Sequence, residues 1–146
     1  MAAMSNYLEN KLIDHVFRGV AYTAPTIAYF GLFTAIPSDA GGGTEVSTGG
    51  YGRAQLACNT TNWAATNAAL STVNPSTGTS GQTSNNSTVT FATPSATWNT
   101  ITHFGIFDQP TGGNLLFWGA LSASKLIQSG DAVTIQASQL VVQIDD

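Results

Sequence analysis

The sequence predicts a mainly β fold, an antiparallel β-sandwich or jelly roll with one N-terminal α-helix. Apolar residues recur at helical spacing only over residues 5–18. After Gly19 the chain changes to short β-branched and aromatic runs separated by Gly, Pro, Asn and Ser, a pattern typical of strands and turns. These runs recur regularly without a second helix between them, which favours an antiparallel sandwich or jelly roll.

The helix is expected to begin after Ser5 or Asn6 and to end before Gly19. Ser and Asn are preferred N-cap residues, and Glu9 in the first turn and Arg18 in the last turn suit the helix dipole. Gly is the usual residue just beyond a helix end. The apolar stripe consists of Leu8, Leu12, Ile13, Val16 and Phe17. It predicts a helix that packs on one face or end of the sheet, and docking on a partner protein is the alternative.

We treat residues 1–146 as a single structural domain, with the helix at about 5–18 and the sandwich at about 26–146. Two long loops interrupt the strands, a glycine-rich loop over 37–50 and a Ser/Thr/Asn/Gly-rich loop over 59–87. We interpret the second loop as a polar insert that points outward and contributes little to stability. The expected strands are at about 26–34, 51–58, 87–92, 100–107, 114–121, 132–137 and 139–144.

The composition excludes several classes of function. Charged residues make up 8% of the chain, against roughly 25% in an ordinary soluble domain. Residues 54–107 contain no Asp, Glu, Lys or Arg, so this stretch supplies little acid, base or metal chemistry. Four basic residues form no stripe that would neutralise several phosphates, so direct nucleic-acid binding is not expected. Charges near the N-terminus and the absence of a run of about 18 apolar residues also argue against a signal peptide and a membrane span.

Candidate catalytic and metal-binding residues are few. Asp39 and Glu45 flank the run Gly41–Gly43, but Ca²⁺ needs about six to eight oxygen ligands, and the run lacks the Gly-Lys-Ser/Thr ending of a phosphate loop. His103 and Asp108 suggest a Ser-His-Asp hydrolase, but no Gly-x-Ser-x-Gly motif is present and His103 lies in a predicted strand. Paired carboxylates for a polysaccharide-degrading enzyme are scarce as well. We therefore expect no enzyme activity, no cofactor and no metal.

The tryptophans Trp63, Trp98 and Trp118 allow two interpretations. They either form a carbohydrate-stacking platform or pack in the core or at a subunit interface. We favour packing, because Trp118 lies in the apolar run 114–121. Cys58 is the one cysteine of the chain, so it cannot form an internal disulfide, and we expect it to be a small buried hydrophobe.

Several strings along the chain form a recognisable pattern. They cover residues 32–46, 50–53, 98–108 and 111–116, together with the helix at 5–19 and the ending at 129–135. This pattern resembles a family of small tailed-bacteriophage virion proteins that are often labelled tail-fibre proteins. Residues 57–90 depart from it, because they carry a longer Ser/Thr/Asn/Gly insert. The resemblance implies a virion component without catalytic residues, made in the host cytoplasm.

The resemblance and the composition together predict a noncatalytic structural protein of the virion. We expect a capsid decoration (cement) protein that stabilises the head through oligomeric contacts on the capsid surface. The alternative is a tail-fibre or receptor-binding-associated module of the phage tail, in which the 59–87 loop and exposed aromatics bind host glycans. The expected partners are further copies of the chain, forming a trimer, and the major capsid protein or other virion proteins. The expected interface residues are Leu8, Leu12, Val16, Phe117 and Trp118.

Overall fold

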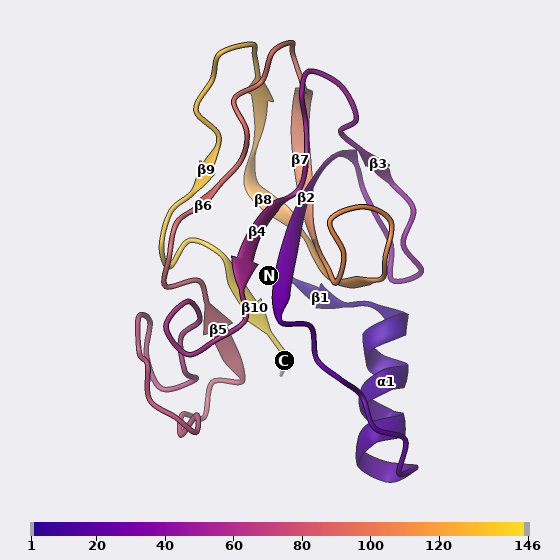
Figure 1. The fold of residues 1–146 in the computed structure, drawn as a ribbon, viewed down its shortest axis with the longest axis vertical. Helices are drawn as coiled ribbons and strands as arrows, with labels where there is room; N and C mark the ends of the chain where they lie inside the picture. Colours follow the sequence, from indigo (N-terminus) through magenta and orange to yellow (C-terminus); the bar gives the residue numbers. More distant parts are fainter. Residues whose placement is uncertain (1, 145–146) are drawn as a thin grey trace.

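The chain folds around one six-stranded antiparallel sheet, and the computed structural model describes residues 2–144 (Figure 1). The elements in chain order are β1 (Ala3–Met4), α1 (Asn6–Phe17), β2 (Ile27–Ala35), β3 (Thr44–Glu45), β4 (Ala54–Ala57), β5 (Gln82–Ser84), β6 (Val89–Thr90), β7 (Asn99–Phe107), β8 (Leu115–Ile127), β9 (Thr134–Ile135) and β10 (Val141–Gln143). The main sheet has the order β1-β8-β7-β2-β3, and β4 also pairs with β2. Two further antiparallel pairs, β10-β5 and β6-β9, lie outside it.

The long strands β2, β7 and β8 form the centre of the main sheet. The first two confirm the strands predicted at 26–34 and 100–107, whereas β8 continues to Ile127, beyond its predicted end at residue 121. Gly31 on β2 pairs with Gly105 on β7. A Cβ atom on Gly31 would lie 2.8 Å from Glu45 Oε1, so this position needs glycine because a side chain from β3 crosses directly over it.

The core lies between the main sheet and the two short sheets. Strands β6, β9 and β10 contribute residues to it, and an isolated parallel bridge from Ala2 to Val142 joins the edge at β1 to β10. Trp98 is 1% exposed, forms an edge-to-face pair with Tyr51, and donates its indole N–H to the Gly49 carbonyl. The antiparallel two-layer arrangement confirms the predicted mainly β fold. The main-sheet core residues include Phe30, Leu32, Ile101, Phe104 and Ile106, and the opposing layer supplies Val89, Phe91, Leu140 and Val142.

The helix α1 begins and ends where the capping signals predict. Ser5 is the N-cap and its hydroxyl accepts from the Leu8 amide at 3.3 Å, and Gly19 follows the C-cap with a φ of 71°. The helix packs only through its first half, because Leu8 is buried against β8 whereas Val16 and Phe17 are exposed. Its second half projects from the body at the lower right of Figure 1. The prediction of a helix packed on the sheet is therefore confirmed for its first turns only.

The prediction of an outward polar insert over 59–87 is wrong at its C-terminal end. Residues 82–84 form β5, which pairs with β10, and Asn85 is fully buried. Ala64 and Ala65 are also buried, and residues 67–70 and 72–77 are exposed. The C-terminal end of the insert is part of the second layer because β5 pairs with β10. Its N-terminal end is held on β5 by the hydrogen bond from the Ala64 amide to the Ser84 carbonyl, and its middle points outward.

Candidate functional site

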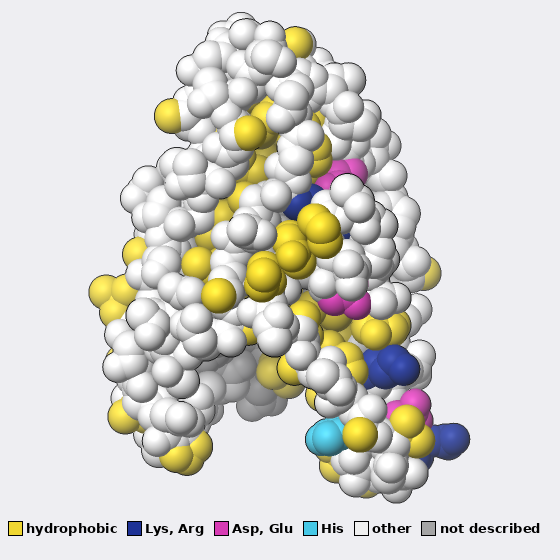
Figure 2. Space-filling model, in the orientation of Figure 1, with side chains coloured by type: hydrophobic (Ala, Val, Ile, Leu, Met, Phe, Trp, Pro, Cys, Tyr) yellow, Lys and Arg dark blue, Asp and Glu magenta, His cyan; other side chains and the backbone are white. Residues whose placement is uncertain are grey.

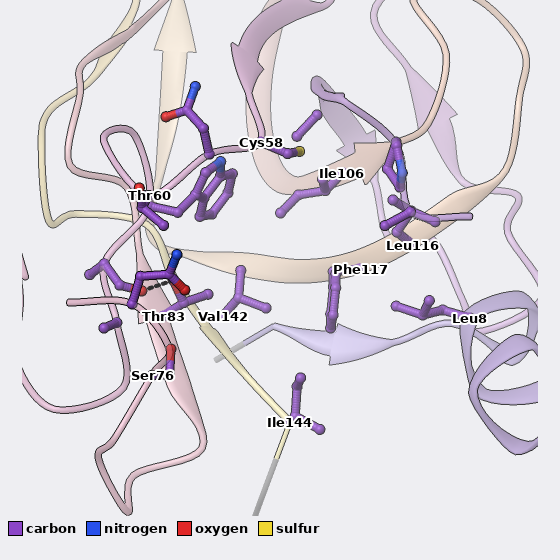
Figure 3. A pocket seen from close by; sticks show the side chains of 18 of the residues that line it. Leu8, Cys58, Thr60, Ser76, Thr83, Ile106, Leu116, Phe117, Val142 and Ile144 are labelled. Atoms are coloured by element: carbon purple, nitrogen blue, oxygen red, sulfur yellow. Dashed lines mark hydrogen bonds between the residues drawn. The ribbon is translucent and has the colours of Figure 1, made fainter. Parts of the chain in front are cut away.

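An apolar groove lies between α1 and the 59–84 segment, with a cavity volume of about 530 Å³. Figure 3 shows Leu8 on the helix at one side of this groove, Thr83 and Ser76 at the other, and Phe117 between them. None of the residues that line the groove is charged. A surface of this composition suits contact with another apolar surface better than chemistry on a substrate.

The main sheet supplies the base of the groove. Ile106 on β7 and Phe117 on β8 are register partners, so both side chains lie on the face that the groove exposes. The far wall includes Trp63, which stacks on Phe30 with ring centroids 6.2 Å apart. Cys58 also lines the groove and is exposed, so its prediction as a buried hydrophobe is wrong. Strand β4 ends at Ala57, and the cysteine lies at the point where the chain leaves the sheet.

The structure brings most of the predicted interface residues together. Leu8, Leu12 and Phe117 line the groove, and Val16 is 65% exposed on the same helix. Trp118 is separate from them. It packs with Phe33, Phe107 and Leu115 in the smaller hydrophobic cluster, because adjacent residues of a strand point to opposite faces. Whether these residues form an interface remains a prediction.

The projecting half of α1 and the residues just after it carry exposed apolar side chains, which we call the helix ridge and define as Ile13, Val16, Phe17 and Val20. Their exposed fractions are 51%, 65%, 79% and 50%. Figure 2 shows hydrophobic atoms on this end of the helix, beside the hollow that separates the helix from the rest of the molecule. Single exposed apolar residues are ordinary, but a contiguous group beside an apolar groove is typical of a protein interaction surface.

The carboxylates considered as candidate catalytic or metal-binding groups have structural partners instead. Asp39 Oδ1 accepts from the indole N–H of Trp118 at 3.0 Å. Asp108 accepts from the amide and the side chain of Asn114, both at 2.7 Å. Within residues 2–144, no group of three or more His, Cys, Asp or Glu residues is placed to hold a metal ion.

The imidazole of His103 has a local partner as well. It lies on β7, and its Nδ1 is 2.8 Å from the Thr102 hydroxyl oxygen. Asp108 lies just beyond the end of that strand and, as described above, is hydrogen-bonded to Asn114. The arrangement holds loops and strands in place, and it does not gather these side chains around a common cleft.

Sequence reasoning missed a buried ion pair between Arg53 and Glu45. Arg53 Nε and Nη2 donate to the two Glu45 oxygens, both at 2.8 Å, and the guanidinium carbon lies 3.4 Å from the ring centroid of Phe107. Tyr51 donates its hydroxyl to Glu45 at 2.9 Å. Burial raises the pKa of Tyr51 well above its ordinary value, so this phenol stays a hydrogen-bond donor at neutral pH. In the sequence, this pair is indicated only by Glu45 and the next charged residue along the chain, Arg53.

Comparison with known protein families shows to which family this chain belongs. The family model described as "Podophage GP4 fiber I protein gp80" matches residues 3–143. The chain belongs to this Gp80 family. Family membership confirms the resemblance to phage virion proteins of the tail-fibre kind and assigns the chain a virion structural role. No curated protein matches the chain in a sequence comparison. None of the helices in the described part has the length and apolar character of a membrane span.

Proposed function

We propose that this Gp80-family protein is a noncatalytic structural subunit of a phage tail fibre, and that it assembles with further copies of itself through the helix ridge and the apolar groove. The family description supports the fibre location. The observation that carries the proposal is the presence, on one chain, of an exposed apolar ridge and an uncharged apolar groove of about 530 Å³.

A second copy is the occupant that fits this groove best. Fully burying a Val, Ile or Phe side chain contributes about 1.5–3 kcal/mol, so several ridge residues together would stabilise a contact strongly. The charged pair Asp14 and Arg18 on the helix is satisfied locally, with Arg18 Nε 2.8 Å from Asp14 Oδ1. A ridge that docks in the groove of the next copy can close as a ring, and the trimer expected from the sequence is one such ring.

We predict that Phe17→Asp abolishes self-association without unfolding the chain. Phe17 is 79% exposed, so the isolated fold loses little, whereas a charge placed in an apolar contact costs several kcal/mol and weakens association by about 100-fold or more. Light scattering at micromolar concentration should give a multiple of 15.1 kDa for the wild type, three times for a trimer, and 15.1 kDa for the variant.

The matched control is Leu126→Asp, because Leu126 is 55% exposed on β8 and lies outside both the ridge and the groove. This variant should keep the wild-type mass. An unchanged mass for Phe17→Asp would remove the ridge from the proposed contact. If the wild type is monomeric at micromolar concentration, self-association in solution is excluded. The proposal would then require that the copies assemble on the phage particle.

Capsid decoration, which the sequence favours, is the second candidate function. The observation in its favour is the compact form of residues 2–144, which have no long helix or extended shaft (Figure 1). Immunogold labelling of intact virions distinguishes the two. We expect gold particles at the tail, with labelling absent from virions that lack the protein. Gold spread over the head, together with heads that leak DNA on heating when the protein is missing, would support decoration instead.

A further inference from the structure

A second concave site lies on the other side of the segment 22–25 from the groove. Its volume is about 420 Å³, and its lining mixes aromatic rings with polar groups. Tyr7 comes from α1, Tyr22 precedes β2, Tyr29 lies on β2, and Asp108 with Gln109 come from the loop after β7. We call this site the tyrosine cup. Since Tyr22 and Pro25 line both sites, the segment between them is the wall that separates the cup from the groove.

The phenol hydroxyls of the cup are available to a ligand, although the Tyr29 ring packs against the smaller hydrophobic cluster and Lys11 Nζ lies 5.6 Å from the Tyr7 ring centroid. Tyr7, Tyr22 and Tyr29 are each half-buried, and in the described chain Tyr51 is the tyrosine whose hydroxyl has a hydrogen-bond partner. Burial raises the pKa of Tyr22, and the nearby charges of Tyr7, Asp108 and Cys58 raise it further. The Tyr22 hydroxyl therefore stays protonated at neutral pH and can both donate and accept.

The polar side of the cup is held in place before any ligand binds. Both oxygens of Asp108 accept from Asn114 at 2.7 Å, and each oxygen retains capacity for a further donor. The backbone of Gln109 is anchored because its carbonyl accepts from Arg53 Nη1 at 2.9 Å, while its side chain is exposed. A carboxylate and a loop backbone that are held in place at the edge of an aromatic cavity are suited to orienting a small ligand.

We propose that the tyrosine cup binds a neutral pyranose unit of a polysaccharide. A pyranose has apolar C–H faces, which suit the tyrosine rings, and a rim of hydroxyls, which suit the Asp108 carboxylate, the Gln109 amide and the phenols. An apolar ligand would leave these polar groups unpaired, and the free carboxylate capacity opposes an anionic ligand. This binding role goes beyond the structural role. The helix ridge takes no part in the cup, and Gln109 lines the cup but not the groove, so Gln109→Ala tests saccharide binding separately from self-association.

The experiment uses an array of bacterial surface polysaccharides and their repeating oligosaccharides, followed by titration calorimetry with the best binder. The wild type should bind at least one member. Tyr22→Ala should weaken binding by about tenfold, the loss typical of truncating a central contact, and Gln109→Ala by about threefold because its exposed side chain lies at the rim. Tyr22→Phe keeps the ring and should lose less. Leu126→Ala, outside the cup, should bind as the wild type does.

Gln109→Ala keeps the test decisive if Tyr22→Ala fails to fold, because the Gln109 side chain is exposed. Binding that is unchanged in both variants, or an array without any bound member, overturns the proposal. A proline-rich decapeptide is included as a probe, because tyrosine-lined grooves also bind such segments. Peptide binding that is lost in Tyr22→Ala, without saccharide binding, would overturn the saccharide assignment as well.

Discussion

Asn85→Ala is expected to lower the free energy of unfolding by about 3 kcal/mol or more. The Asn85 side chain is fully buried, and its Nδ2 donates to the carbonyls of Ser87 at 2.9 Å and Gln136 at 2.8 Å. Its Oδ1 accepts from the Leu140 amide at 3.0 Å. Alanine leaves the Ser87 carbonyl and the buried Leu140 amide without these partners, whereas the Gln136 carbonyl keeps the Gln139 amide at 3.2 Å. Each group that loses its partner costs about 1–3 kcal/mol, and the emptied space of the side chain adds to the loss.

The matched control is the neighbouring residue. Asn86 has a buried Oδ1 without a partner in the described chain, and its Nδ2 reaches the Ser71 carbonyl only at 3.5 Å. Asn86→Ala should therefore cost about 1 kcal/mol or less. Urea unfolding followed by tryptophan fluorescence measures both variants, and Asn85→Ala should also lower Tm by about 6–12 °C. Equal losses for the two variants would show that the side chain of Asn85 does not hold the second layer together.

The elements that the sequence predicts well are those whose signals are local. The N-cap Ser5 and the C-terminal Gly19 lie within the helix's own stretch of chain, and the structure places the ends of α1 beside them. The strands β2 and β7 are nine residues long and rich in β-branched and aromatic residues, so their composition alone indicates them. Each of these signals depends only on residues within the element or directly beside it.

The elements that the sequence misses depend on distant partners. Strand β5 reads Gln-Thr-Ser, which has little β propensity, and it exists because β10 pairs with it in register from Val141↔Ser84 to Gln143↔Gln82. Strands β1 and β3 are two residues long and are likewise defined by their pairing with β8 and β2. Hydrogen bonding across the sheet, rather than propensity, decides these short strands.

The sequence predicts the helix side of the groove but not its opposite wall. The helical stripe contains Leu8 and Leu12, which do line the groove. Phe117 and Trp118 are adjacent in one strand, so they cannot share a face, and the strand period alone was enough to separate them. The far wall, which includes Trp63 and Thr83, results from the fold of the 59–84 segment against β10 and has no counterpart in the sequence pattern.

Replacing Arg53 with Met is expected to lower the free energy of unfolding by about 3–5 kcal/mol. The Arg53 side chain is 7% exposed and forms a two-point pair with Glu45. Its Nη1 also donates to the carbonyls of Gln109 and Gly112, so it ties the loop between β7 and β8 to β3 and β4. Methionine keeps the apolar stem and removes the charge, so the largely buried Glu45 carboxylate loses its cation and keeps the Tyr51 hydroxyl as a neutral donor.

Two comparisons separate the buried charge from a general effect of losing an arginine. Arg18→Met removes the exposed i, i+4 pair with Asp14, and it should cost at most about 0.5 kcal/mol. Combining Arg53→Met with Glu45→Gln removes the stranded carboxylate, so the double variant should be less destabilised than the sum of the single variants. Additive losses would mean that the Arg53 contacts to the Gln109 and Gly112 carbonyls, and not its pairing with Glu45, stabilise the fold. Equal losses for Arg53→Met and Arg18→Met would show that neither the Glu45 pair nor the carbonyl contacts of Arg53 stabilise the fold more than an exposed ion pair does.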